Sequence, residues 1–369
     1  MTKIMRTSAL TCRHIDLGGS LQEYIRMAVP MSYSTDPQDE HNAVRTKAGM
    51  YDLTAFLKFY VRGKDAVKAL NHAMTHDMTR LKPGTSKYGP FLRDDGTICD
   101  DGIAFNMGND EYLVWHGDGC ARKMVEASCE GLDAEVDVDD AVHLVSVQGP
   151  MAHEFLNEYT PMDLPALKYF NHQETELFGC PCVISRTGFS GERGYEIFAR
   201  PDTICTIWDN LYEKGQDLGI IPCSLSSIFT LRIEAGLVWR RFDLMEKTPW
   251  EVGLGWVIHP EKEADYRGKE AVLAAKGKER FLLCGIEADI DEALEGGETL
   301  LVDGQEAGSV NGKPAYSVNL NKSLAFCCLK PECSAVGTRV EIVGEKGACT
   351  GTVVAFPVYD PKKERVKAK

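Results

Sequence analysis

The sequence lacks the long hydrophobic run that a membrane span requires. No stretch approaches the ~18 uninterrupted apolar residues of a spanning helix, and the amino terminus has neither the apolar core nor the cleavage pattern of a signal peptide. An excess of basic residues is also missing, because 41 Lys and Arg stand against 55 Asp and Glu, a formal net charge of -14. Such a chain has no field that attracts a polyanion. We therefore expect a cytoplasmic protein that binds neither nucleic acid nor a membrane.

The usual metal and catalytic motifs are absent as well. The 13 cysteines form no C-x-x-C pair at metal-ligand spacing, so we expect no metal site and reduced, mostly buried thiols. His72 and His76 are four residues apart, but no third ligand lies near them in sequence, which favours solvent-facing or capping roles. No dinucleotide-binding, P-loop, zinc-hydrolase or nucleophile-elbow motif is found. The functions that depend on those motifs are therefore disfavoured.

The pattern along the chain predicts more than one domain. A strand at 57–61, a helix after it, a hairpin formed by 97–105 and 112–115, and a helix near 120–129 suggest an inserted α+β unit at 51–140. From about residue 280, five short β-type runs separated by turns predict a small barrel or sandwich at 279–369. Residues 261–278, rich in Lys, Glu and Ala, then form a helical linker. The basic end after Pro361 is expected to be solvated and frayed.

Two clusters of carboxylates stand next to glycine and aromatic residues. Asp100 and Asp101 interrupt a strand, so alternation sends the two side chains to opposite faces, and one of them should face an interior or a cleft. That carboxylate could cap a loop, or it could bind a ligand nitrogen or act as an acid or base. The residues alone leave these two alternatives equal.

Glu196 is the carboxylate of the second cluster. It follows a loop with three glycines in seven positions and lies on a strand between Tyr195 and Ile197. A carboxylate there could make a bidentate contact with a 2-amino-pyrimidine edge such as a pterin presents. The alternative is a plain hairpin with a surface glutamate.

With these residues in place, the sequence resembles the aminomethyltransferase family, which comprises the glycine-cleavage T-protein and its tetrahydrofolate-dependent demethylase relatives, including dimethylsulfoniopropionate demethylase. The resemblance is collinear from His14 to Arg365, and its specificity lies in the order and spacing of the segments. The main segments are 17–19 (Leu-Gly-Gly), 29–33 (Val-Pro-Met-Ser-Tyr), 51–54 (Tyr-Asp-Leu-Thr), 96–101 (Gly-Thr-Ile-Cys-Asp-Asp), 148–150 (Gln-Gly-Pro), 186–197, 231–236 (Leu-Arg-Ile-Glu-Ala-Gly) and 266–270 (Tyr-Arg-Gly-Lys-Glu).

The resemblance implies an α+β fold with three domains in a ring around a central folate channel. The folate-binding domain would be discontinuous, 1–50 plus 141–260, with 51–140 inserted and a β-barrel-like domain at 279–369. Carried over by position, Asp101 would be the acidic residue near the reacting nitrogens. In the reaction expected for such a protein, Tyr195 could assist the leaving group. Glu196 would anchor the pterin, and Tyr88 and Met50 would contact the cofactor from the channel wall.

Departures from the family pattern bear on the substrate. The Ala-Arg-Asp run of T-proteins is here Ser227-Ile228-Phe229, and Arg240 with Arg241 replaces an expected tyrosine. The two arginines are candidates for a carboxylate of the folate tail or of the substrate. A lipoyl carrier is acidic, and a chain of charge -14 is poorly suited to dock it.

The expected activity is therefore a tetrahydrofolate-dependent one-carbon transfer from a small O-, S- or N-methyl compound, giving 5-methyltetrahydrofolate. The first alternative is a glycine-cleavage aminomethyltransferase, which would need a lipoyl carrier protein as its partner. The second is a folate-binding protein without catalysis. The methyl donor and the oligomeric state do not follow from the sequence.

Overall fold

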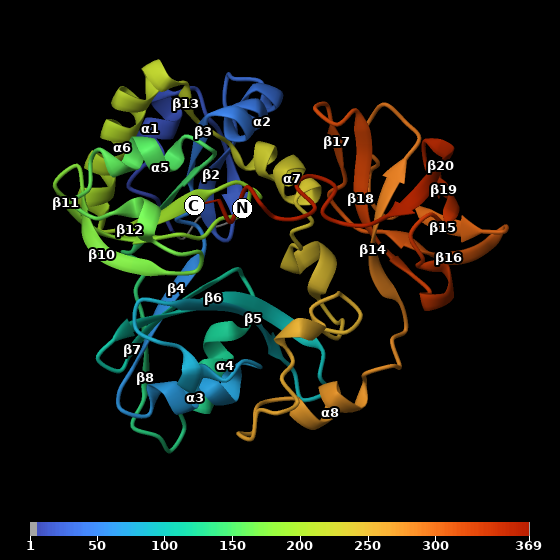
Figure 1. Ribbon diagram of the computed structural model, residues 1–369, viewed down its shortest axis with the longest axis horizontal. Helices are drawn as coiled ribbons and strands as arrows, with labels where there is room; N and C mark the ends of the chain where they lie inside the picture. Colours follow the sequence, from blue (N-terminus) through green and yellow to red (C-terminus); the bar gives the residue numbers. More distant parts are fainter. Residues whose placement is uncertain (1–5, 369) are drawn as a thin grey trace.

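The computed structural model describes residues 6–368 and arranges them as three lobes, each built on its own sheet (Figure 1). Helix α7 (Leu225–Glu234) lies between the first lobe and the carboxyl-terminal lobe, where it contacts strands of both. The expected α+β class with a carboxyl-terminal barrel is confirmed. The division into domains at the expected residues stays a prediction, and the expected boundary at residue 50 falls inside a strand, Ala48–Asp52.

The first lobe is a six-stranded sheet in the order β10-β11-β12-β9-β3-β13. All its pairs are antiparallel except β3 with β13, which is parallel. Its strands are β3 (Ala48–Asp52), β9 (His143–Gln148), β10 (His172–Leu177), β11 (Cys180–Ser185), β12 (Gly194–Ala199) and β13 (Ile220–Pro222). Around it lie the hairpin β1 (Ser20–Tyr24) and β2 (Met27–Ser32), and the helices α1 (Thr11–Asp16), α2 (Pro37–Thr46), α5 (Ala152–Asn157), α6 (Pro201–Gly215) and α7. Strands on both sides of the insertion thus form one sheet.

The second lobe is a five-stranded sheet in the order β5-β6-β7-β4-β8 with two helices. Its elements are β4 (Leu57–Arg62), α3 (Ala66–Ala73), β5 (Ser86–Leu92), β6 (Ile98–Gly108), β7 (Glu111–His116), α4 (Ala121–Ser128) and β8 (Glu135–Val138). The strand, the hairpin and both helices expected here are confirmed. Helix α3 buries Ala66 and Leu70, which form its apolar stripe.

The carboxyl-terminal lobe is a barrel, because β14 pairs with both β20 and β18 and so closes the order β14-β20-β19-β15-β16-β18. Its strands are β14 (Leu282–Ala288), β15 (Thr299–Val302), β16 (Gln305–Val310), β17 (Ala315–Ser317), β18 (Lys322–Leu329), β19 (Arg339–Gly344) and β20 (Gly347–Val354). Two of them, β16 and β17, were missed, since β17 is only three residues long and β16 has few apolar side chains. The expected linker is helical only in α8 (Lys269–Ala274).

Several short turns of helix connect these elements. They are η1 (Met78–Arg80), η2 (Leu164–Ala166), η3 (Gln216–Leu218), η4 (Arg240–Leu244, a π-helix), η5 (Gly255–Val257) and η6 (Pro331–Cys333). Within residues 6–368, no helix combines the length and the apolar character needed to cross a bilayer.

The basic carboxyl-terminal segment is not frayed, contrary to expectation. It runs from the barrel back to the first lobe, where Arg365 pairs with Glu192 at 2.7 Å (Figure 1). Arg186 donates to the carbonyls of Val366 and Ala368. These buried partners hold the segment in place.

One expectation about the thiols is also wrong. Cys99 and Cys120 form a disulfide, with Cα atoms 6.4 Å apart, and the eleven other cysteines are free. The sequence could not show this pair, because the two residues come together only when the start of α4 packs on β6.

Candidate functional site

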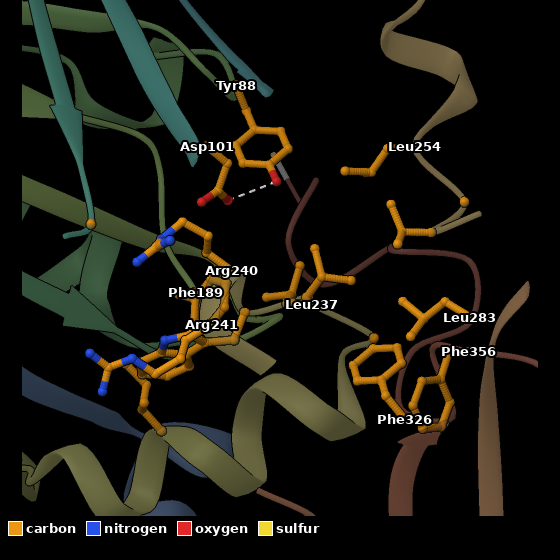
Figure 2. Close-up of a pocket in the computed structure, with 18 of the residues that line it drawn as sticks. Tyr88, Asp101, Phe189, Leu237, Arg240, Arg241, Leu254, Leu283, Phe326 and Phe356 are labelled. Atoms are coloured by element: carbon orange, nitrogen blue, oxygen red, sulfur yellow. Dashed lines mark hydrogen bonds between the residues drawn. The ribbon is translucent and has the colours of Figure 1, made fainter. Parts of the chain in front are cut away.

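All three lobes contribute to one cavity of about 700 Å³. Tyr88 and Asp101 come from the second lobe, Glu196 from the first, and Phe326 from the barrel. Figure 2 shows Asp101 and Tyr88 on one side and Leu254, Leu283, Phe326 and Phe356 on another, with Arg240 and Arg241 below Asp101 in this view. A largely apolar cavity with a few converging polar groups is the usual form of a small-molecule site.

Asp101 faces this cavity from β6. It stands opposite Pro90 of the neighbouring β5, and the Tyr88 hydroxyl on that strand donates to Asp101 Oδ2 at 2.9 Å. Burial, and secondly the charge of Asp100, raises the pKa of the Asp101 carboxyl to about 7. A carboxyl with such a pKa can give up or take a proton near neutrality.

Asp100 points the other way, into the second lobe. Its carboxylate accepts from His116 Nδ1 at 2.8 Å and from the backbone N–H groups of Ala121 and Asp101, both at 2.9 Å. The alternation expected for the two aspartates is therefore confirmed.

Glu196 reaches the cavity from β12. Only 1% of it is exposed, which excludes the plain surface glutamate, and within residues 6–368 its single hydrogen bond from a protein side chain comes from the Thr187 hydroxyl. Burial raises the pKa of its carboxyl to about 7. The loop before β12 needs glycine, because a Cβ at Gly188 or Gly194 would overlap the side chain of Gln148.

Arg240 and Arg241 both line the cavity from η4, and both pair with Asp118. Arg240 also places Nε 3.4 Å from Asp100 Oδ1 and is 10% exposed, whereas Arg241 is 59% exposed. The guanidinium of Arg240 is thus occupied by carboxylates of this chain. Binding of a ligand carboxylate by either arginine stays a prediction.

Two expected site residues lie elsewhere. Tyr195 is the neighbour of Glu196 on β12, so it faces the opposite side of the sheet, where it is fully buried and accepts from Arg193 Nε at 3.0 Å. Met50 on β3 is also fully buried in the core of the first lobe. Neither side chain lines the cavity. The expected help of Tyr195 to the leaving group and the expected cofactor contact of Met50 do not fit this arrangement.

The sequence interpretation missed part of the site. An aromatic wall of the cavity is made by Tyr24, Phe56, Trp115, Phe189 and Trp239. These rings come from separate elements, and no local spacing marks them. His116 could have been found, because the hairpin register places it opposite Gly102, next to Asp101.

His76 is buried, although a solvent-facing or capping role was expected. Its Nδ1 lies 3.0 Å from His259 Nε2 and its Nε2 lies 2.9 Å from the Tyr88 carbonyl, so it supports the strand that carries Tyr88. In the part of the chain that the structure describes, no three His, Cys, Asp or Glu side chains are grouped to hold a metal.

Comparisons with known proteins agree with this architecture. The GCVT N-terminal domain model matches residues 10–262, and the model of the glycine cleavage T-protein C-terminal barrel domain matches residues 282–360. Among curated proteins, the chain is 36% identical to the heme-dependent oxidative N-demethylase gamma subunit of Ectopseudomonas mendocina, over all of both chains. It is 34% identical to an aminomethyltransferase of Streptomyces coelicolor, over 97% of this chain and 99% of that one.

Among solved structures, the fold matches the glycine cleavage system aminomethyltransferase T from Bartonella henselae. The TM-score is 0.89 at 22% identity, with 97% of this chain and 99% of that chain covered. At this identity the likeness concerns the fold alone.

Proposed function

The chain belongs to the aminomethyltransferase family of the glycine-cleavage T-protein, and from this premise we propose that it is a tetrahydrofolate-dependent one-carbon transferase. The observation that carries the proposal is the pair of cavity carboxyls, Glu196 and Asp101, on two different lobes of one apolar cavity. The carboxyl of Glu196 suits recognition of the folate, and that of Asp101 suits proton transfer.

The residues present fit tetrahydrofolate. Its pteridine ring carries a 2-amino-pyrimidinone edge with adjacent N–H donors, and Glu196 offers a carboxylate that has one protein donor, Thr187, and capacity for more. The aromatic wall suits a flat ring, and a cavity of about 700 Å³ lies within the range of cofactor sites. We infer that Glu196 holds the pteridine and that Tyr88 and the aromatic wall contact it.

Bound tetrahydrofolate would supply the nucleophilic nitrogen that accepts the one-carbon unit. The chain's own contribution is to hold the reactants together and to exclude water, which can account for a large part of the rate. Asp101 is placed to hold or release a proton at its carboxyl, and the hydrogen bond from Tyr88 fixes its orientation. Arg240 and Asp118 complete the polar end of the cavity.

We propose a small methylated compound as the source of the carbon, and an N-methyl group in particular. Support comes from the relative named as a gamma subunit of an oxidative N-demethylase, which is 36% identical along the whole chain. Because that relative is named as one subunit of a larger enzyme, we propose that this chain also has partner subunits. These partners would release the carbon from the amine.

The second candidate is a glycine-cleavage aminomethyltransferase that receives its substrate on a lipoyl carrier. The Streptomyces coelicolor relative, 34% identical over nearly the full length, favours it. The two functions differ in the donor. A third outcome, folate binding without transfer even when the proposed partner subunits are present, would leave a binding protein.

The test begins with anaerobic calorimetry of the full chain with tetrahydrofolate. The folate is then analysed by mass after incubation with methylated amines, sulfonium compounds and ethers, and separately with an aminomethylated lipoyl carrier. A one-carbon gain from a methylated donor supports the first function, and its mass distinguishes a methyl from a methylene unit. Transfer only from the lipoyl carrier supports the second function, and absence of folate binding refutes both.

A further inference from the structure

The two adjacent aspartates of β6 differ in what surrounds them. Asp100 is fully buried, and a ring of donors surrounds its carboxylate, formed by His116 Nδ1, two backbone N–H groups and, at 3.4 Å, Arg240 Nε. Asp101 is partly exposed to the cavity and receives one hydrogen bond from a protein side chain, that of Tyr88. Donors are thus concentrated on the aspartate that cannot touch a ligand.

Two local features accommodate this ring of donors: a glycine beside the carboxylate and a disulfide next to it. Gly119 must lack a side chain, because a Cβ there would overlap the Asp100 carboxyl group. The disulfide between Cys99 and Cys120 ties the residue before Asp100 to the residue before Ala121, so it joins the strand to the start of α4. The position of the Asp100 carboxylate is therefore fixed by the second lobe.

We propose that Asp100 is a positioning residue whose charge, opposed by that of Arg240, adjusts the protonation of the buried Asp101 carboxyl in the cavity. The backbone N–H of Asp101 donates to Asp100 Oδ1, so the negative charge of Asp100 is held next to Asp101. Like charges this close disfavour ionisation of the second carboxyl. The charge of Asp100 therefore favours the protonated form of Asp101, and in that form the carboxyl can deliver a proton to a leaving group.

Other charged and titratable groups act on the same pair. They are Tyr88 on β5, His116 on β7, Asp118 in the loop before α4, and Arg240 and Arg241 in η4. Arg240 is the cation that opposes Asp100, because its charge favours ionised Asp101. Removal of Asp100 and removal of Arg240 should shift the titration of Asp101 in opposite directions.

The experiment follows the carbon-13 resonance of the Asp101 carboxyl, identified by its absence in Asp101→Asn, as the pH of the full ligand-free chain is raised. In Asp100→Asn we expect titration to move to lower pH by about one unit or more, and in Arg240→Gln to higher pH. Asp94→Asn, which alters an exposed carboxylate in the turn between β5 and β6, is the matched control and should cause no shift. If Asp100→Asn does not fold, the shift of the Asp101 titration in Arg240→Gln tests the proposal by itself.

An unchanged titration in Asp100→Asn, or no upward shift in Arg240→Gln, would overturn the proposal. Its bearing on catalysis rests on the proposed function, but the resonance is recorded without folate, so the two can fail separately. Where transfer to tetrahydrofolate is measurable, the alkaline loss of turnover should move with the carboxyl titration in both variants. A profile that stays fixed while the carboxyl shifts would refute the catalytic bearing of Asp100.

Discussion

Replacing Glu196 with glutamine is expected to stabilise the folded chain above neutral pH while weakening tetrahydrofolate binding. The carboxyl is buried, and burial raises its pKa from 4.5 to about 7. Below the unfolded value of about 4.5 both states are protonated, so the carboxyl contributes no penalty. As the pH rises from there to about 7 the unfolded state ionises first, and stability falls by about 1.4 kcal/mol per unit of pH.

Glutamine does not titrate, so the variant escapes this loss. We expect it to be more stable than the parent by about 3 kcal/mol at about pH 8 and nearly equal to it at about pH 4.5. Its carbonyl can still accept from Thr187, so little packing is lost. Loss of the charged acceptor should weaken tetrahydrofolate binding by about 10- to 100-fold, since hydrogen bonds to charged groups contribute about 1.5–3 kcal/mol.

The assay is chemical denaturation at both pH values, with calorimetry for the folate affinity. Glu192→Gln is the matched control, because Glu192 is equally buried but pairs with Arg45 and Arg365. Breaking that buried pair should destabilise the chain by about 3–5 kcal/mol. A Glu196→Gln variant that is no more stable than the parent at alkaline pH would refute the reasoning, as would the same stability difference at both pH values.

Three further outcomes are expected. Asp101→Asn should lower turnover far more than folate affinity, and equal losses in single-turnover rate and binding would contradict a role in chemistry. Tyr195→Phe should leave turnover unchanged and cost about 1 kcal/mol of stability, because its hydroxyl lies in the core; a large loss of turnover would restore it to the site. Reduction of the Cys99–Cys120 disulfide, or Cys120→Ser, should lower the free energy of unfolding by about 3 kcal/mol, because the unfolded chain is then no longer closed into a loop between cysteines 21 residues apart. Denaturation with and without a thiol reductant measures this loss.

Local pattern was sufficient for much of the fold. The apolar stripe of α3, the hairpin of β6 and β7, and most barrel strands follow from periodicity and turn residues, which act over a few neighbours. The opposite faces of Asp100 and Asp101 follow in the same way. The family resemblance, which depends on order and spacing along the chain, added the roles expected for Asp101 and Glu196, which the residues alone had left open.

What lay beyond the sequence was decided by contacts between distant segments. Tyr195 and Glu196 are neighbours, but only packing decides which face of β12 meets the cavity and which meets the core. Arg240 and Asp118 are 122 residues apart, and their pairing exists because η4 reaches the second lobe. The sequence by itself thus determined most of the elements and the two carboxyls of the site. Tertiary structure decided burial and the pairing of charges, because these depend on whatever segments fold against each side chain.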